Sequence, residues 1–119
     1  MKVAFIGLGN MGASLAKVIA KEVAAPDLLL VNCSPQKVQD FISQYGGTAS
    51  SLQQAFEEAE VIFLGVKPYQ ICPLLEEYQD VLSQRSDLLL ISMAAGLELE
   101  KMAGVVKNDR VGLIRIMPN

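Results

Sequence analysis

The sequence contains no histidine and no tryptophan, and only two of its 119 residues are cysteines. Without histidine the chain lacks the usual acid/base side chain near neutral pH, so Ser-His-Asp, Cys-His and histidine–metal sites are excluded within it. The cysteines, Cys33 and Cys72, are too few for a disulfide framework or a zinc site. They fit a reducing compartment, and we expect a cytoplasmic protein without a metal site.

Two further absences concern membranes and nucleic acids. No apolar run approaches the ~20 residues of a membrane-spanning helix, and no N-terminal stretch has the pattern of a signal peptide. Ten Lys and Arg stand against thirteen Asp and Glu, which gives a net charge of −3 and no general basic footprint. We therefore expect neither a membrane nor a nucleic acid among the partners.

Apolar residues make up 51% of the chain and gather in short, unbroken blocks. Unbroken rather than alternating blocks are typical of parallel strands that are covered on both faces. The predicted strands are residues 3–6, 28–31, 47–49 (weaker), 61–64, 88–91 and 111–116.

Stretches with helical periodicity separate these blocks. The predicted helices are residues 11–24, 36–45, 51–59, a stretch after Pro68 whose apolar positions extend to Leu82, and 98–105; Ser51 is a predicted N-cap. The alternation predicts an α/β fold: a Rossmann-like, doubly wound, mainly parallel sheet of about six strands with helices on both faces. Residues 1–119 would form one domain.

Residues 7–12, Gly-Leu-Gly-Asn-Met-Gly, form a complete G-x-G-x-x-G between a predicted strand and a predicted helix. Gly7 would permit the tight turn, Gly9 would let a pyrophosphate approach the backbone, and Gly12 would let helix and strand pack closely. The helix N-terminus would offer N–H groups and partial positive charge to phosphates. The pattern favours dinucleotide binding over a glycine-rich turn without a ligand.

The end of the second predicted strand, residues 31–37, carries no carboxylate. An NAD site usually has an Asp or Glu there, which binds the ribose 2′-hydroxyl. Ser34 can donate a hydrogen bond and Lys37 can supply positive charge, which suits a 2′-phosphate. We therefore expect NADP(H) in preference to NAD(H), although Lys37 also fits an ordinary solvated helix position. Cys33 lies in this loop, on the adenosine side.

Other strand ends carry candidate ligands because doubly wound sheets bind ligands outside the carboxyl ends of their strands. Lys67 would lie near the middle or the nicotinamide half of the cofactor, or else is a surface lysine before Pro68. The small residues at 92–96 would let a flat ring or ribose lie against the backbone, or else form a helix-entry turn. Arg115 could point toward the ligand or outward, with Asn119 nearby.

Residues 5–12, 32–37, 65–68, 92–96 and 115–119 together resemble the N-terminal half of the pyrroline-5-carboxylate reductases, in order and spacing, over the whole chain. The resemblance implies NAD(P)H-dependent reduction of the C=N bond of 1-pyrroline-5-carboxylate to L-proline, in proline biosynthesis. The cofactor contacts it implies are Ile6, Gly7, Leu8, Gly9, Asn10, Met11, Ser34, Gly65, Val66, Lys67, Pro68, Met93, Ala94 and Ala95. No catalytic residue follows from it.

Two departures from the family pattern qualify these expectations. Leu52 stands where many members carry an asparagine that contacts the cofactor. The family also has a C-terminal helical domain that supplies substrate contacts and the homo-oligomer interface, and this chain lacks it. We expect a cofactor-binding portion that is inactive alone. The alternatives are a non-catalytic NADP-binding regulatory protein and the cofactor domain of a β-hydroxyacid dehydrogenase-like enzyme.

Overall fold

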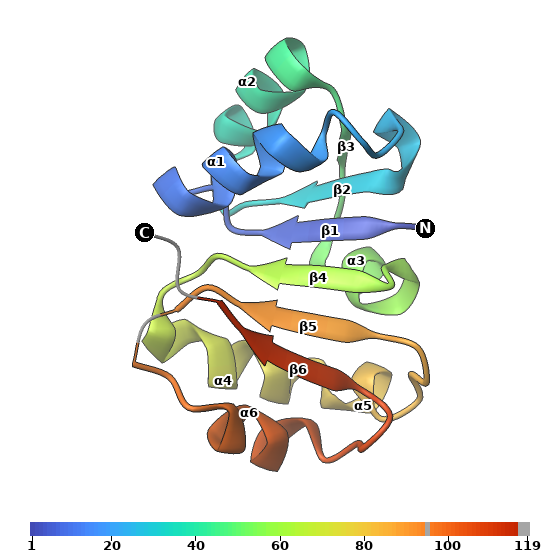
Figure 1. The fold of residues 1–119 in the computed structure, drawn as a ribbon, viewed down its shortest axis with the longest axis vertical. Coiled ribbons are helices and arrows are strands. Elements are labelled where there is room, and N and C mark those ends of the chain that lie inside the picture. Colours follow the sequence, from blue (N-terminus) through green and yellow to red (C-terminus); the bar gives the residue numbers. More distant parts are fainter. Residues whose placement is uncertain (95, 117–119) are drawn as a thin grey trace.

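In the part of the chain that the structure describes, six parallel strands form one sheet in the order β3-β2-β1-β4-β5-β6 (Figure 1). The structure is a computed structural model that describes residues 1–94 and 96–116. The strands are β1 Val3–Ile6, β2 Leu28–Val31, β3 Thr48–Ala49, β4 Val61–Leu64, β5 Leu89–Ser92 and β6 Gly112–Arg115. The predicted doubly wound sheet is therefore confirmed.

The central strand β1 explains why the apolar blocks are unbroken. All four of its residues are buried, because β2 and β4 pair with its two edges and helices cover its two faces. Phe5 of β1 lies opposite Phe63 of β4 in register, and the two rings stack with centroids 4.5 Å apart. A polar residue within such a strand would have no route to water.

Helices lie on both faces of the sheet (Figure 1). Residues of α1 and α2 pack with β1 and β2 on one face, and residues of α3, α4, α5 and α6 pack on the other. The helices are α1 Asn10–Ile19, α2 Pro35–Tyr45, α3 Leu52–Glu58, α4 Pro68–Glu77, α5 Gln79–Leu82 and α6 Leu99–Val106, with a short 3-10 helix at Ala25–Asp27.

Two predicted helices need correction. The first ends at Ile19, not at residue 24, because the chain tightens into turns there: Lys21 N–H bonds to Val18 and Glu22 N–H to Ile19, three residues back. The helix after Pro68 is interrupted at Tyr78, whose φ of −107° and ψ of 19° leave the helical region. The predicted N-cap Ser51 is confirmed, since its side chain accepts from the Gln54 N–H at 3.1 Å.

The outer strand β6 is the least covered part of the sheet. None of its four residues is fully buried, and Ile114 is 42% exposed. At the centre, the chain winds outward from β1 to β3 in one direction and from β4 to β6 in the other. Such a reversal leaves a crevice at the carboxyl ends of β1 and β4, where doubly wound sheets bind ligands. No helix among residues 1–94 and 96–116 is long and apolar enough to cross a membrane.

Candidate functional site

The turn after β1 depends on glycine at its first position. Gly7 has a φ of +97°, which side chains disfavour, and a Cβ there would lie 2.8 Å from the Gly65 carbonyl group. Its N–H donates to the Val31 carbonyl at 2.8 Å, and the Gly65 N–H donates to the Ile6 carbonyl at 2.8 Å. These hydrogen bonds thus hold the carboxyl-terminal ends of β1, β2 and β4 together at this turn.

The other two glycines of the motif differ in what surrounds them. A Cβ at Gly12 would lie 2.5 Å from the Gly7 carbonyl oxygen, so helix α1 approaches the turn itself closely. A Cβ at Gly9 would meet no heavy atom of the described residues within 4 Å. Gly9 therefore borders open space that the fold itself does not need. Its φ of −69° is accessible to any residue.

Helix α1 presents unpaired N–H groups to the same space. Its Ala13 N–H bonds back to the Gly9 carbonyl at 2.8 Å. The preceding N–H groups, those of Asn10, Met11 and Gly12, have no carbonyl one turn earlier within the helix. These donors and the positive end of the helix dipole make the turn suited to an anion such as a phosphate.

The loop after β2 is fixed by Asn32. Its side-chain oxygen accepts from the Leu8 N–H at 2.9 Å, and its amide nitrogen donates to the Ser34 carbonyl at 3.4 Å. Ser34 is the N-cap of α2, but its hydroxyl makes no capping bond, so it remains available to a ligand. Lys37, one turn into α2, is exposed beside it.

The loops after β4 and β5 complete this edge. Lys67 is the N-cap of α4, where its N–H donates to the Gln70 side-chain oxygen at 3.0 Å and its carbonyl accepts from the Gln70 N–H at 2.9 Å. Buried Ser92 accepts from the Ala94 N–H at 3.2 Å. A Cβ at Gly65 would lie 2.9 Å from the Met93 methyl carbon, so the two loops are in contact.

These loops enclose a cavity of about 560 Å³, here called the glycine cavity. It carries two lysines, Lys37 and Lys67, and no carboxylate among its lining residues, so its charge favours an anion. Its lining residues are Gly7, Gly9, Asn10, Met11, Gly12, Asn32, Cys33, Ser34, Lys37, Gly65, Val66, Lys67, Pro68, Gln70, Met93 and Ala94.

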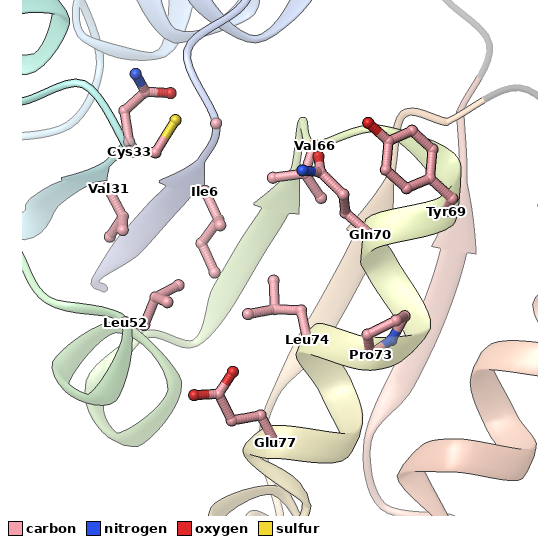
Figure 2. A pocket seen from close by; sticks show the side chains of 12 residues that line it. Ile6, Val31, Cys33, Leu52, Val66, Tyr69, Gln70, Pro73, Leu74 and Glu77 are labelled. Atoms are coloured by element: carbon pink, nitrogen blue, oxygen red, sulfur yellow. The ribbon is translucent and has the colours of Figure 1, made fainter.

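A second cavity of about 570 Å³, here called the leucine cavity, adjoins the first and shares Gly7, Asn32, Cys33, Val66 and Gln70 with it. Figure 2 shows Leu52 of α3 and Leu74 of α4 pointing toward one another across it, with Ile6 between the two helices. Its remaining lining residues are Val31, Tyr69, Pro73 and Glu77. The walls are largely apolar and suit a flat ring.

Most of the predicted contacts meet at these two cavities. Ile6 lines the leucine cavity, and twelve of the other predicted residues line the glycine cavity. Leu8 lines neither, because its side chain is buried in the core and only its backbone N–H faces Asn32. Arg115 lines neither, since its guanidinium donates to the Leu97 carbonyl at 3.4 Å. Ala95 and Asn119 lie outside the described residues.

Sequence reasoning missed the part of the site that α4 supplies. Gln70, Pro73, Leu74 and Glu77 follow one another at helical spacing and line the leucine cavity. From the sequence alone, Leu74 is one of the apolar positions of the helix predicted after Pro68. The departure noted at Leu52 does fall on the cavity wall. Beside the cavity, burial raises the pKa of Tyr78, and the Glu77 carboxylate raises it further.

Comparisons with known proteins agree on the kind of protein to which this site belongs. A family model described as "NADP oxidoreductase coenzyme F420-dependent" matches residues 2–96. Pyrroline-5-carboxylate reductase of Escherichia coli is 39% identical over 99% of this chain and 44% of its own length. The chain spans less than half the length of the curated relatives it matches.

Solved structures give the same result. A pyrroline-5-carboxylate reductase from Coxiella burnetii superposes with a TM-score of 0.88 at 30% identity, over 99% of this chain and 44% of that one. The Plasmodium falciparum pyrroline carboxylate reductase with NADP bound superposes with a TM-score of 0.78 at 26% identity, over 100% of this chain and 42% of that one.

Proposed function

This chain belongs to the family described as NADP oxidoreductase, coenzyme F420-dependent, and from that premise we propose that it is the dinucleotide-binding domain of a pyrroline-5-carboxylate reductase. The observation that carries the proposal is the pair of adjoining cavities at the carboxyl ends of β1, β2, β4 and β5, with open space at Gly9. Curated relatives of that name match nearly the whole chain.

The glycine cavity would hold the pyrophosphate. Asn10, Met11 and Gly12 line this cavity, and their N–H groups at the start of α1 would donate to the phosphates. The absence of a Cβ at Gly9 would let the phosphates reach the backbone. The adenosine half would extend into the leucine cavity, whose walls are apolar.

NADP(H) rather than NAD(H) is part of this proposal. The Ser34 hydroxyl and the Lys37 ammonium lie where the second strand ends, and residues 31–37 contain no carboxylate to repel a 2′-phosphate. A phosphate with one hydroxyl donor and one cation is held by charge-assisted hydrogen bonds.

The nicotinamide half would lie against residues 65–68, Met93 and Ala94. When bound, the dinucleotide supplies a hydride, which in this proposal reduces the imine carbon of 1-pyrroline-5-carboxylate. The chain's own residues would orient the nicotinamide ring, because Gly65 and Met93 are in close contact and together form one wall of the glycine cavity. The proton for the imine nitrogen has no histidine source here, because the sequence contains none.

We propose that a further helical domain supplies the substrate contacts and the homo-oligomer interface. The curated relatives are more than twice as long as this chain, which leaves room for such a domain. The half-covered strand β6, with Ile114 at its surface, is the face proposed to meet it. A cytoplasmic location is part of the same proposal and fits the free thiols of Cys33 and Cys72.

Calorimetric titration with NADPH and NADH tests the proposal. The chain is expected to bind NADPH about tenfold more tightly than NADH, because one charge-assisted contact to the 2′-phosphate is worth about that much. Lys37→Ala should remove most of this preference, whereas Lys101→Ala, an exposed lysine of α6, should keep it. Equal or tighter binding of NADH by the unaltered chain contradicts the NADP(H) assignment, and failure to bind either contradicts the function.

A further inference from the structure

The leucine cavity contains one carboxylate, that of Glu77. Glu77 is the last residue of α4, three positions after Leu74 and therefore on nearly the same side of the helix. Figure 2 shows its side chain below Leu52 and Leu74, with the carboxylate directed toward the α3 side of the cavity. Cys33, by contrast, lies at the end where the glycine cavity begins.

Two other polar side chains of this cavity already form hydrogen bonds. Asn32 holds the Leu8 N–H and the Ser34 carbonyl. The side-chain oxygen of Gln70 holds the Lys67 N–H. Tyr69 is 77% exposed, at the rim. A ligand in the cavity therefore finds few unused hydrogen-bond acceptors along its walls.

The carboxylate of Glu77 is one of those unused acceptors. In the part of the chain that the structure describes, the carboxylates that accept hydrogen bonds are those of Asp40, Glu58 and Asp87. Neither ion pair in residues 1–94 and 96–116 includes Glu77. A carboxylate can only accept, so it selects for a ligand that presents an N–H or O–H group at this end of the cavity.

We propose that Glu77 determines the base of the dinucleotide, by accepting a hydrogen bond from the exocyclic amino group of an adenine held between Leu52 and Leu74. This inference rests on the proposed function, because it presupposes a dinucleotide whose ribose lies near Cys33. Adenine presents an amino donor at its 6-position, whereas an unsubstituted purine base presents only a C–H group there and keeps the same ring nitrogens as acceptors. The purine therefore offers the Glu77 carboxylate no N–H donor at this position.

The test compares NADPH with an analogue in which unsubstituted purine replaces adenine, by calorimetric titration of the whole chain. The unaltered chain should bind NADPH about three- to tenfold more tightly than the analogue, the worth of one hydrogen bond. In Glu77→Ala the two dinucleotides should bind within about twofold of each other. Glu77→Gln should keep part of the preference, since its amide oxygen still accepts.

Glu76→Ala is the matched control, because it removes the same charge from an exposed neighbour that does not line the cavity. Its preference for NADPH should equal that of the unaltered chain. Equal binding of both dinucleotides by the unaltered chain, or a preference that Glu77→Ala leaves intact, overturns the role of Glu77 while the proposed function stands. Failure to bind either dinucleotide overturns both.

Discussion

The three glycines of the motif at the β1–α1 turn are glycine for two different reasons. Gly7 and Gly12 are required by neighbouring backbone, since a Cβ at either would lie within 2.8 Å of a carbonyl atom. Gly9 has a φ that any residue can adopt and open space where its Cβ would be. The fold therefore explains two of the three glycines, and the proposed binding of a dinucleotide would explain the third.

This contrast predicts opposite effects of two alanine substitutions. Gly9→Ala should change the free energy of unfolding by no more than about 1 kcal/mol but weaken NADPH binding about tenfold or more, because phosphate contacts are lost. Gly12→Ala should lower the free energy of unfolding by about 1–3 kcal/mol through overpacking against the Gly7 carbonyl oxygen. Urea unfolding and calorimetric titration measure the two effects. Gly9→Ala with unaltered NADPH affinity would contradict the phosphate assignment.

The exposed ion pair between Lys2 and Glu58 makes part of the stability depend on pH. The two side chains lie 2.6 Å apart, and the hydrogen bond between them lowers the pKa of Glu58 and raises that of Lys2. A lowered carboxyl pKa stabilises the fold above the unfolded-state pKa, near 4.5, and this contribution is lost as the pH falls through the folded-state pKa. For Lys2 the contribution is complete below its unfolded-state pKa, near 10.5, and is lost as the pH rises through its raised folded-state pKa.

Glu58→Gln should therefore lose less stability than the unaltered chain when the pH is lowered from 7 to 3. The difference should be small and should shrink in high salt, because both side chains are solvated. Thermal unfolding at each pH measures it. Glu57→Gln, an exposed neighbour outside the pair, serves as the control and should follow the unaltered chain.

At the scale of elements, Arg85 joins the end of α3 to the segment after α5. Its guanidinium donates to the Phe56 and Ala59 carbonyls at 2.6 Å each, and it pairs with Asp87 at 3.3 Å. The last carbonyls of a helix have no partner within it, so the side chain supplies what the backbone cannot. Only 12% of the Arg85 side chain is exposed, so its bonds to the two carbonyls are partly shielded from water, whereas Asp87 is 69% exposed.

Arg85→Met should accordingly lower the free energy of unfolding by about 2–4 kcal/mol, since it leaves two carbonyls without a charged donor. Arg110→Met is the matched control, because Arg110 is exposed and both of its side-chain hydrogen bonds, to the Asn108 side-chain oxygen and to the Ser83 carbonyl, are long at 3.4 Å. It should cost no more than about 0.5 kcal/mol. Denaturant unfolding compares the two, and equal losses would show that Arg85 is not a tie between elements.

The strands were predictable from sequence because β1, β2 and β4 are apolar throughout, and only a sheet covered on both faces requires that. The break at Tyr78 was not predictable, since the apolar spacing continues through it to Leu82. The glycine turn was predictable from its motif. The wall of the leucine cavity was not predictable, because residues of both α3 and α4 form it. The separation of these two helices is set by how they pack on the sheet rather than by local sequence.

At the scale of the whole molecule, the site lies where the winding direction of the sheet reverses. β1 and β4 are neighbours in space but are separated in sequence by α1, β2, α2, β3 and α3. Both cavities open on the loops that follow these two strands. The proposed dinucleotide site is thus formed by residues of this chain, whereas the substrate contacts are proposed to lie in a further domain.

The chain alone should therefore bind NADPH yet show negligible NADPH oxidation in the presence of 1-pyrroline-5-carboxylate. Absorbance of the reduced nicotinamide follows the reaction, and the Escherichia coli relative serves as the active reference. Binding without turnover supports a cofactor domain whose substrate contacts lie elsewhere. Turnover near the rate of the reference would contradict the proposal that the substrate contacts lie in a further domain.

The pairing of β1 on both edges also has a consequence for synthesis. Once the ribosome has released Ala49, β1, β2 and β3 can associate, but the second edge of β1 stays open until Val61–Leu64 emerges. An open apolar strand is a template for pairing with other chains. A nascent chain halted before β4 should therefore aggregate rather than form a smaller stable sheet, and the rate of elongation past residue 64 sets how long that hazard lasts.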